Sequence, residues 1–464
     1  MNYDHLKRPL ILVIFGITGD LAQRKLLPAL YQLLKAGDLP LQLHIVGISR
    51  RDVTKDDVYA NLASFVGEPD FNGDLLQHLK DCTEMVQMDL LNEDAYRELL
   101  EHLQEVESGY EDGASRLYYL SIPSQAFTPI IRLLGATGHN APLVSGDAPR
   151  LLIEKPFGYD LASAKELVGV LNENFGEGQI YRIDHYVAKE TVQNILVFRF
   201  QNPLFESIWN SQHIDHISIV AFEQLDIEGR ANFYEQTGAL RDLIQSHLLQ
   251  LLAITTMRRP AQLESVDIHT AKFDLLSAVR PIAPDEVGSK AIRGQYEGYR
   301  DEVGKADSNV ETFARLELAI DNDQWRGVPI VLETGKALDA KRTAVTISFR
   351  QSDDTPEESN QLVFRIQPAE GITLRLQVKR PGIKTITDRA DMDFDYTKSF
   401  NDRPAEAYER VIVDAIRGDQ TLFATAAEVI RSWEIVENVL EQWSRGGDDL
   451  RYYSKGSIGP VESS

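Results

Sequence analysis

Short apolar runs alternate with amphipathic stretches through residues 1–183, which is the pattern that βαβ units give on a parallel sheet. Helical periodicity lies between most of these runs. The predicted strands are Pro9 to Phe15, Leu43 to Ile48, Met85 to Met88, Leu117 to Ser121, Arg150 to Glu154 and Gln179 to Ile183. We therefore expect residues 1–183 to form an α/β domain with a Rossmann-like, doubly wound parallel sheet.

The periodicity changes after about residue 210. Apolar and polar residues alternate along 314–320, 345–350 and 372–379, as in antiparallel strands with one face buried. Long helices are predicted from Gly238 to Thr255 and near the C-terminus, where one face carries Val429, Trp433, Val436, Leu440 and Trp443. With loops expected at 281–310 and 351–360, residues 184–464 predict an α+β domain whose large, mainly antiparallel sheet is flanked by helices.

Composition limits the possible partners. The 464 residues include 48 Lys and Arg against 71 Asp and Glu, a net charge of −23 that repels nucleic acid and anionic membranes unless basic residues gather locally. We therefore expect neither partner, and any anionic ligand must meet a local group of cations. No apolar run predicts a membrane span, because the run that precedes Gly16 is short and leads into a glycine turn.

Cys82 is the only cysteine. A single cysteine permits neither an intrachain disulfide nor a cysteine-based zinc cluster, which fits a reducing compartment. We expect a cytoplasmic protein that binds no metal.

A run of small residues, Gly16, Gly19 and Ala22, follows the first predicted strand and opens a helix. Small residues let the backbone approach a pyrophosphate, and the helix N-terminus supplies N–H donors. Thr18 stands where the stricter dinucleotide motif has a glycine, so a tight structural turn is the alternative.

The end of the second predicted strand bears on cofactor choice. Arg50 and Arg51 stand where an NAD site usually has an acidic residue that binds the ribose 2′-hydroxyl. Arginine favours a 2′-phosphate, so NADP is expected, with NAD possible as well; two solvated surface arginines are the alternative. Asp89 follows the third strand and fits either the adenosine side of the site or a helix cap.

Three further segments carry candidate chemistry. In RIDHYVAKE, His185 and Lys189 would share a face near a helix N-terminus if the segment is helical, an arrangement suited to a phosphate dianion. Lys155 follows a predicted parallel strand, at the edge where ligands bind in such sheets. His247 stands among leucines and isoleucines, where a histidine is usually a satisfied core residue. For His185, Lys189 and Lys155 the alternative is solvated surface.

The chain resembles the glucose-6-phosphate dehydrogenase family from end to end. The matching segments are FGITGDLAQRKLLPAL, IEKPFG, RIDHYVAKETVQNI, GALRDLIQSHLLQ, RGQY, GKALDAK and AYERVIVDAIRGD. The resemblance implies an oxidoreductase of carbohydrate metabolism, in the pentose phosphate pathway, that oxidises glucose 6-phosphate to 6-phosphogluconolactone with NADP. It also implies a second domain that binds substrate and forms a homodimer or homotetramer.

The resemblance further implies roles for particular residues. His247 would be the general base for the C1 hydroxyl, and Asp184 would orient and stabilise it. His185, Tyr186 and Lys189 would hold the 6-phosphate. Further contacts to the sugar or its phosphate would come from Lys155, Glu223, Asp242, Lys336, Lys341 and Gln367. The cofactor site would comprise Gly16, Ile17, Thr18, Gly19, Asp20, Leu21, Lys25, Arg50, Asp89 and Lys155.

Two alternatives stay open on the sequence. One is a dehydrogenase of another family that acts on unphosphorylated sugars, which would not need His185 and Lys189. The other is a nucleotide-binding regulatory protein without turnover, against which the presence of His247, Asp184 and Lys189 argues. One departure from the family pattern is Ala188, which stands where the family has a glycine.

Overall fold

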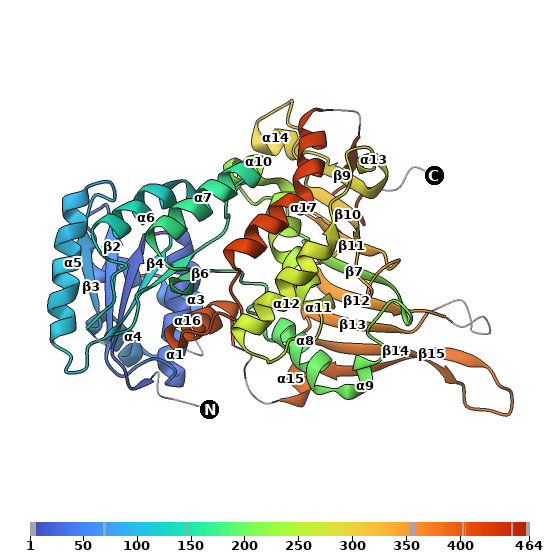
Figure 1. The fold of residues 1–464 in the computed structure, drawn as a ribbon, viewed down its shortest axis with the longest axis horizontal. Coiled ribbons are helices and arrows are strands. Elements are labelled where there is room, and N and C mark those ends of the chain that lie inside the picture. The colour runs from blue at the N-terminus through green and yellow to red at the C-terminus, as the bar shows by residue number, and fades with distance from the viewer. Residues whose placement is uncertain are drawn as a thin grey trace. The chain divides into compact units, whose positions relative to one another are not determined.

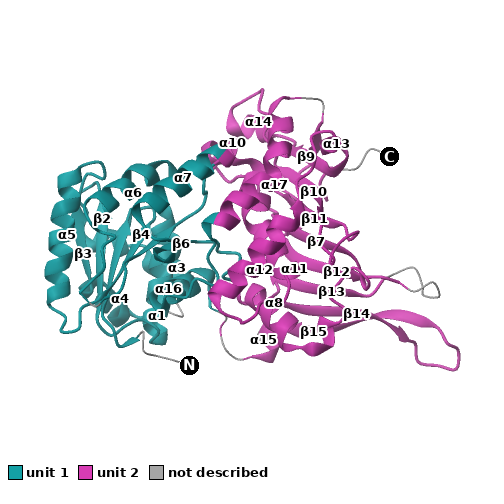
Figure 2. Ribbon diagram, viewed as in Figure 1, with its two compact units in different colours: residues 1–158, 162–188, 405–426 teal, residues 159–161, 189–404, 427–464 magenta. Residues whose placement is uncertain are grey.

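The chain folds into two compact units (Figures 1 and 2). Unit 1 comprises residues 1–158, 162–188 and 405–426, and unit 2 comprises residues 159–161, 189–404 and 427–464. The structure is a computed structural model that describes residues 6–67, 71–144, 146–351, 359–400, 403, 405–446 and 449–460.

Unit 1 is built on a parallel sheet that has six strands among the described residues, in the order β3-β2-β1-β4-β5-β6. The strands are β1 (Leu10–Phe15), β2 (Leu43–Ser49), β3 (Thr83–Gln87), β4 (Ser115–Leu120), β5 (Arg150–Ile153) and β6 (Ile180–Arg182). Each overlaps a strand predicted from the sequence, so the doubly wound fold is confirmed. Every residue of β1 is buried, as expected for a central parallel strand covered on both faces.

Helix α5 (Glu93–Ser108) packs on the sheet of unit 1 through the apolar face that its sequence periodicity creates. Asn92 caps the helix by accepting the N–H of Asp94 at 3.1 Å. Tyr96, Leu99 and Leu103 then share one helix face and pack in the core with Val46 of β2.

Residues 405–426 return the chain to unit 1 and carry helix α16 (Ala407–Arg417). The Arg150 guanidinium donates to the carbonyl oxygens of Ala415 and Ile416, both at 2.8 Å, and so satisfies the end of this helix. A single division after residue 183 therefore does not describe the two units. The local sequence of α16 carries no information about which sheet the helix covers.

Unit 2 contains a mixed sheet of ten strands within the part of the chain that the structure describes. Its order is β15-β14-β13-β12-β7-β11-β10-β9-β16, with β8 (Val279–Arg280) paired to β10. The other strands are β7 (Ile214–Phe222), β9 (Ala291–Tyr296), β10 (Phe313–Ile320), β11 (Ile330–Gly335), β12 (Arg342–Phe349), β13 (Gln361–Gln367), β14 (Gly371–Lys379), β15 (Thr387–Asp395) and β16 (Leu450–Tyr453). The sheet is mainly antiparallel, as predicted, but β7 pairs β11 in parallel and β16 pairs β9 in parallel.

The loop predicted at 281–310 is wrong. This segment holds α13 (Val287–Lys290), β9 and α14 (Tyr299–Val303), and β9 pairs with both β10 and β16. The alternation of polar and apolar residues does not reveal strand β9, because the polar residue Gln295 is buried there. The Gln295 side-chain amide donates to the carbonyl of Val310 at 2.9 Å. Most of the other predicted loop, 351–360, lies outside the described residues.

Both long helices predicted for unit 2 are present. The first comprises the π-helical segment η6 (Leu240–Leu248) and α11 (Leu249–Thr256), and the second is α17 (Ala426–Ser444). In α17 the predicted apolar face, from Val429 to Trp443, is buried. The magenta ribbon of Figure 2 shows α11, α12 (Ser265–Ala278) and α17 against the sheet.

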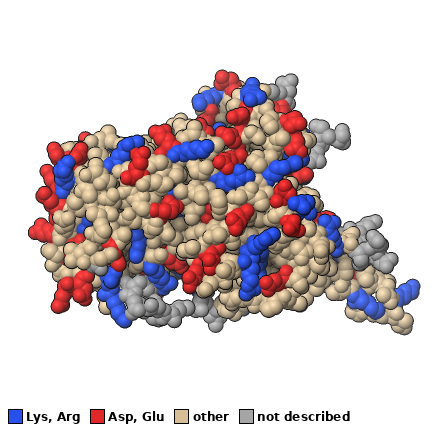
Figure 3. Space-filling model, in the orientation of Figure 1, with Lys and Arg blue, Asp and Glu red and all other residues tan. Residues whose placement is uncertain are grey.

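No helix in the described ranges is both long and apolar enough to cross a membrane. On the face drawn in Figure 3, Lys and Arg side chains lie among Asp and Glu side chains on both units.

Candidate functional site

The turn after β1 brings the backbone very close to β4. Gly16 has φ +78°, and a Cβ there would lie 2.4 Å from the carbonyl oxygen of Ser121. The Gly19 N–H donates to the Gly16 carbonyl at 2.8 Å, and a Cβ on Gly19 would lie 3.0 Å from that same oxygen. Because β1 and β4 flank the point where the strand order reverses, this turn lies where doubly wound sheets bind dinucleotides. The residues present thus fit a nucleotide pyrophosphate.

The other predicted cofactor residues differ in exposure. Ile17 is fully buried, with its side chain against Gly47, so only its backbone is available to a ligand. Lys25 is exposed, and Asp20 forms an exposed ion pair with Arg24 at 2.6 Å. Thr18 and Leu21 are half-buried.

Arg50 and Asp89 follow β2 and β3 at the same edge of the sheet, because all these strands are parallel. Arg50 is exposed, and its carbonyl accepts the Gln87 side-chain amide at 3.3 Å. Asp89 accepts the Leu91 N–H at 3.0 Å within the turn before α5. The N-cap of α5 is Asn92, so Asp89 is not the helix cap that the sequence left open. A cofactor contact by Asp89 stays a prediction.

Glu154 is a buried carboxyl group at the carboxyl end of β5. The Tyr119 hydroxyl donates to its Oε1 at 2.6 Å, and Tyr408 of α16 is a second hydrogen-bond donor to it. Burial raises the pKa of Glu154 to about 7, although both tyrosines and the neighbouring Lys155 act to lower it and Asp184 adds to the rise. Glu154 was not among the residues expected at the site, although a carboxyl group that ends a buried strand beside Lys155 is a usable signal in the sequence.

Asp184 organises the turn that follows β6. Its buried carboxylate accepts the N–H of Tyr186 at 2.9 Å and that of Val187 at 3.4 Å. The His185 ring stacks on the Tyr408 ring, with centroids 6.4 Å apart.

His185 and Lys189 do not share a helix, so the condition on which they would share a helix face is not met. Residues 185–188 form a turn, and α8 (Glu190–Gln201) starts only after Lys189, which is its N-cap with extended backbone angles. The Asp184 carboxylate accounts for the difference, because it takes up N–H groups locally that a helix would leave unpaired at its start. Ala188 lies in this turn and is buried.

One edge of the unit 2 sheet gathers several predicted sugar-binding residues. Glu223 and Lys336 follow the parallel strands β7 and β11, whose register pairs Phe222 with Gly335, and the two side chains form an ion pair. Lys341 is exposed just before β12, whose first residue pairs with Phe222. Gln367 ends β13 opposite Thr343.

Two further contacts tie this edge together. The Lys189 ammonium donates to the Gln367 side-chain carbonyl, and the Gln367 amide donates to Thr343 Oγ1 at 2.9 Å. The Lys336 ammonium lies 5.4 Å from the ring centroid of Tyr234, a buried residue that sequence analysis missed. Burial raises the pKa of Tyr234 well above its usual value, and the carboxylate of Asp242 adds to the rise.

Segment η6 carries Asp242 and His247 and packs against β7 and β11. His247 is fully buried and Asp242 is half-buried. π-Helical turns are rare and occur frequently at functional sites. Asp184 belongs to unit 1 and His247 to unit 2, so their proposed pairing stays a prediction.

Gly238 sets the start of this helix. It has φ +62° and ψ 179°, and a Cβ there would lie 2.4 Å from the Glu311 carboxylate. That carboxylate accepts the Leu240 N–H at 3.0 Å, and the Glu311 carbonyl accepts the Ala239 N–H at 2.9 Å. Glu311, which the sequence did not single out, therefore positions the helix.

Comparison with known proteins identifies the family. The family models for the glucose-6-phosphate dehydrogenase NAD binding domain and C-terminal domain match residues 13–194 and 196–464. The chain belongs to the glucose-6-phosphate dehydrogenase family. The resemblance drawn from the sequence is confirmed, and the alternative of a different sugar dehydrogenase family is wrong.

Individual relatives match this chain over nearly its whole length. The glucose-6-phosphate 1-dehydrogenase of Chlamydia muridarum is 39% identical over 97% of this chain and 94% of its own. That of Bacillus subtilis is 38% identical, over 98% and 95%. A solved structure described as glucose-6-phosphate dehydrogenase in complex with its substrate glucose-6-phosphate has a TM-score of 0.91 at 32% identity, over 98% of this chain and 96% of that one.

The raised pKa of Glu154 predicts a pH-dependent stability. A folded-state pKa of about 7, above the ordinary 4.5, makes the folded state bind a proton more tightly, so the free energy of unfolding falls as pH rises between these values. Glu154→Gln removes the titrating group. The stability of this variant relative to the parent should rise by roughly 3 kcal/mol between pH 4.5 and 8.

Chemical denaturation followed at several pH values measures this difference. Glu173→Gln, at an exposed carboxylate of the same unit, is the control and should show no such trend. A Glu154→Gln difference that does not change with pH would contradict the raised pKa.

Gly238→Ala should lower the free energy of unfolding by about 1–3 kcal/mol, because it places a methyl group on the Glu311 carboxylate in a conformation that glycine alone adopts readily. The matched control is Gly169→Ala in α7 (Leu161–Asn174), where a Cβ meets open space and should stabilise the helix by roughly 0.5–1 kcal/mol. Thermal unfolding of both variants measures the contrast, and equal effects would refute it.

Proposed function

We propose that this chain oxidises C1 of glucose 6-phosphate to 6-phosphoglucono-1,5-lactone, with NADP as the hydride acceptor, in the first step of the oxidative pentose phosphate pathway. The observation that carries the proposal is the match to the glucose-6-phosphate dehydrogenase family over both units. The cations and carboxylates at one edge of the unit 2 sheet support it, since a chain of net charge −23 needs such a group to bind an anionic sugar.

In this proposal the protein supplies the base and the binding groups. His247 takes the proton of the C1 hydroxyl, and Asp184 stabilises the imidazolium that forms. The bound nicotinamide supplies the hydride acceptor. Because the Asp184 carboxylate is buried and held by two backbone N–H groups, it is fixed before the reaction begins.

His185, Tyr186 and Lys189 bind the 6-phosphate. Lys189 donates to Gln367, a neutral acceptor, and a phosphate dianion offers this ammonium a stronger bond because the acceptor then carries the opposite charge. The sugar hydroxyls are bound by Asp242, Lys341, Gln367 and the Glu223–Lys336 ion pair, in which one carboxylate and one ammonium offer both an acceptor and a donor. Lys155 lies between sugar and cofactor in this proposal.

NADP rather than NAD is the proposed cofactor. The support is Arg50, an exposed guanidinium directly after β2 at the edge of the sheet that carries the Gly16 turn. We also propose a homodimer or homotetramer formed through the unit 2 sheet. Exposed apolar residues on and beside its β14–β15 hairpin, Val378, Ile386 and Met392, support this.

The direct experiment mixes the purified protein with glucose 6-phosphate or glucose and with NADP or NAD, and follows the near-ultraviolet absorbance of the reduced nicotinamide. Rapid reduction of NADP with glucose 6-phosphate, and little with glucose, is the expected result. No turnover with any pair would favour the regulatory protein without turnover, and equal rates with glucose would refute the phosphate site.

His247→Asn should lower kcat by roughly 10²- to 10⁴-fold, because the general base is lost. Although His247 is buried, the variant should still bind glucose 6-phosphate. A rise in Tm when the sugar phosphate is added would show this binding. His213→Asn, at an exposed histidine of the same unit, is the control. Turnover that survives in His247→Asn would exclude the base role.

Arg50→Ala should weaken NADP binding roughly 10- to 150-fold, the loss expected for a hydrogen bond to a charged group, and leave NAD binding nearly unchanged. Arg132→Ala removes an exposed arginine elsewhere in unit 1 and serves as the control. KM values for the two cofactors give the comparison. A parallel loss for NADP and NAD would show that Arg50 does not bind the 2′-phosphate.

A further inference from the structure

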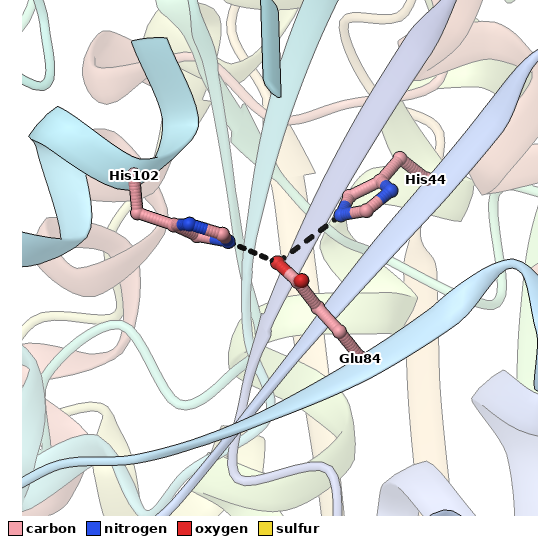
Figure 4. A group of neighbouring side chains, drawn as sticks. All are labelled: His44, Glu84 and His102. Carbon is pink, nitrogen blue, oxygen red and sulfur yellow. Dashed lines mark hydrogen bonds and ion pairs between the residues drawn. The ribbon is translucent and has the colours of Figure 1, made fainter. Parts of the chain in front are cut away.

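Three side chains of unit 1 that are typical metal ligands converge on one point (Figure 4). His44 comes from β2, Glu84 from β3 and His102 from α5. The Glu84 Oε1 atom lies 2.5 Å from His102 Nε2 and 3.1 Å from His44 Nε2. All three candidate ligand atoms lie within 4.8 Å of one another.

The fold dictates this convergence. Strands β2 and β3 pair Val46 with Glu84, so Glu84 and His44 point to the same face of the sheet, because side chains alternate along a strand. Helix α5 packs Leu99 and Leu103 in the core on this face, and His102 stands beside them on the helix. Figure 4 shows both imidazole rings directed at the Glu84 carboxylate.

The cluster lies apart from the proposed reaction site. His44 and Glu84 stand near the starts of β2 and β3, whereas the Gly16 turn, Arg50 and Asp89 follow the ends of their strands. Cofactor binding therefore does not explain why the three side chains lie together.

The surroundings suit a cation. The three side chains are 25%, 31% and 38% exposed, so they are only partly hydrated. Burial acts to raise the pKa of the Glu84 carboxyl, but its contacts with His44 and His102 lower it overall, so the group is an anion. The Nε2 atom of His44 is shielded from solvent and faces the Glu84 carboxylate at 3.1 Å.

We infer that His44, Glu84 and His102 bind a divalent transition-metal ion, with zinc the best fit and water in a fourth position. Two imidazoles and one carboxylate form a donor set that zinc accepts, whereas magnesium and calcium prefer oxygen alone. With metal–ligand bonds of about 2.0–2.2 Å, the ligand atoms of a tetrahedral ion lie roughly 3.3 Å apart. Small side-chain rotations from the observed separations reach that spacing.

This site differs from the expectation that the chain binds no metal. That expectation rested on the single cysteine, and a site of two histidines and one glutamate needs none. The ion would tie β2, β3 and α5 together, so its effect is on the stability of unit 1. The inference is independent of the proposed dehydrogenase function.

The test uses the full chain after dialysis against a chelator. Titration with Co²⁺ should give visible absorption that saturates at one ion per chain, and Zn²⁺ should abolish it by displacement. The affinity should be lower in acidic buffer than in neutral buffer, because protons compete with the ion for the imidazole nitrogens. Zn²⁺ should also raise the Tm of the metal-free protein.

Substitution locates the site. Zn²⁺ affinity, measured by calorimetry, should fall roughly 10- to 100-fold or more in His102→Asn and in Glu84→Gln. Two controls should keep the affinity of the parent. His213→Asn removes a histidine of unit 2, and Cys82→Ser removes the thiol that lies 3.8 Å from His78.

Metal-free variants whose Tm matches the parent show that loss of binding is not loss of fold. Glu84→Gln should also lose the Zn²⁺-dependent rise in Tm. Absence of stoichiometric binding by the parent would overturn the inference. Unchanged Zn²⁺ affinity in the His44→Asn, His102→Asn double variant would overturn it as well.

Discussion

Parallel strand pairing brings polar residues from distant parts of the chain to common edges of both sheets. Parallel strands end on the same side, so the residues that follow them become neighbours. In unit 1 this gathers the Gly16 turn with Arg50, and Glu154 with Asp184. In unit 2 the parallel pair β7 and β11, within a mainly antiparallel sheet, brings Glu223 and Lys336 into an ion pair.

Three carboxyl groups near these edges, those of Glu154, Asp184 and Glu311, are buried, and each is held by specific partners. An unpaired charge in a protein interior is strongly destabilising, whereas one that is paired and hydrogen-bonded is tolerated and fixed in place. Glu154 is held by two tyrosine hydroxyls, Asp184 by two backbone N–H groups and Glu311 by the start of η6. Such positioning lets a site stabilise charge without reorganising during a reaction.

The His44, Glu84 and His102 cluster follows the same geometric rule near the other ends of the strands. The alternation of side chains along β2 and β3 places two ligand types on one face, and α5 adds the third while its apolar residues cover that face. A sheet of this kind therefore offers two edges for polar chemistry, and only the edge after the strands is used for the dinucleotide in the function that we propose.

The sequence by itself determined the strands of unit 1, the half-buried strands β10, β12 and β14, the two long helices of unit 2 and the family. Each depends on residues close in the chain, since periodicity records which face of a single element is buried. The tertiary structure alone decided that β9 joins a sheet where a loop was predicted, and that Tyr408 reaches Glu154 from the far end of the chain. It also decided that Asp184 turns residues 185–188 away from a helix. These features depend on contacts and hydrogen bonds that form only after the chain has folded, and local periodicity carries no record of them.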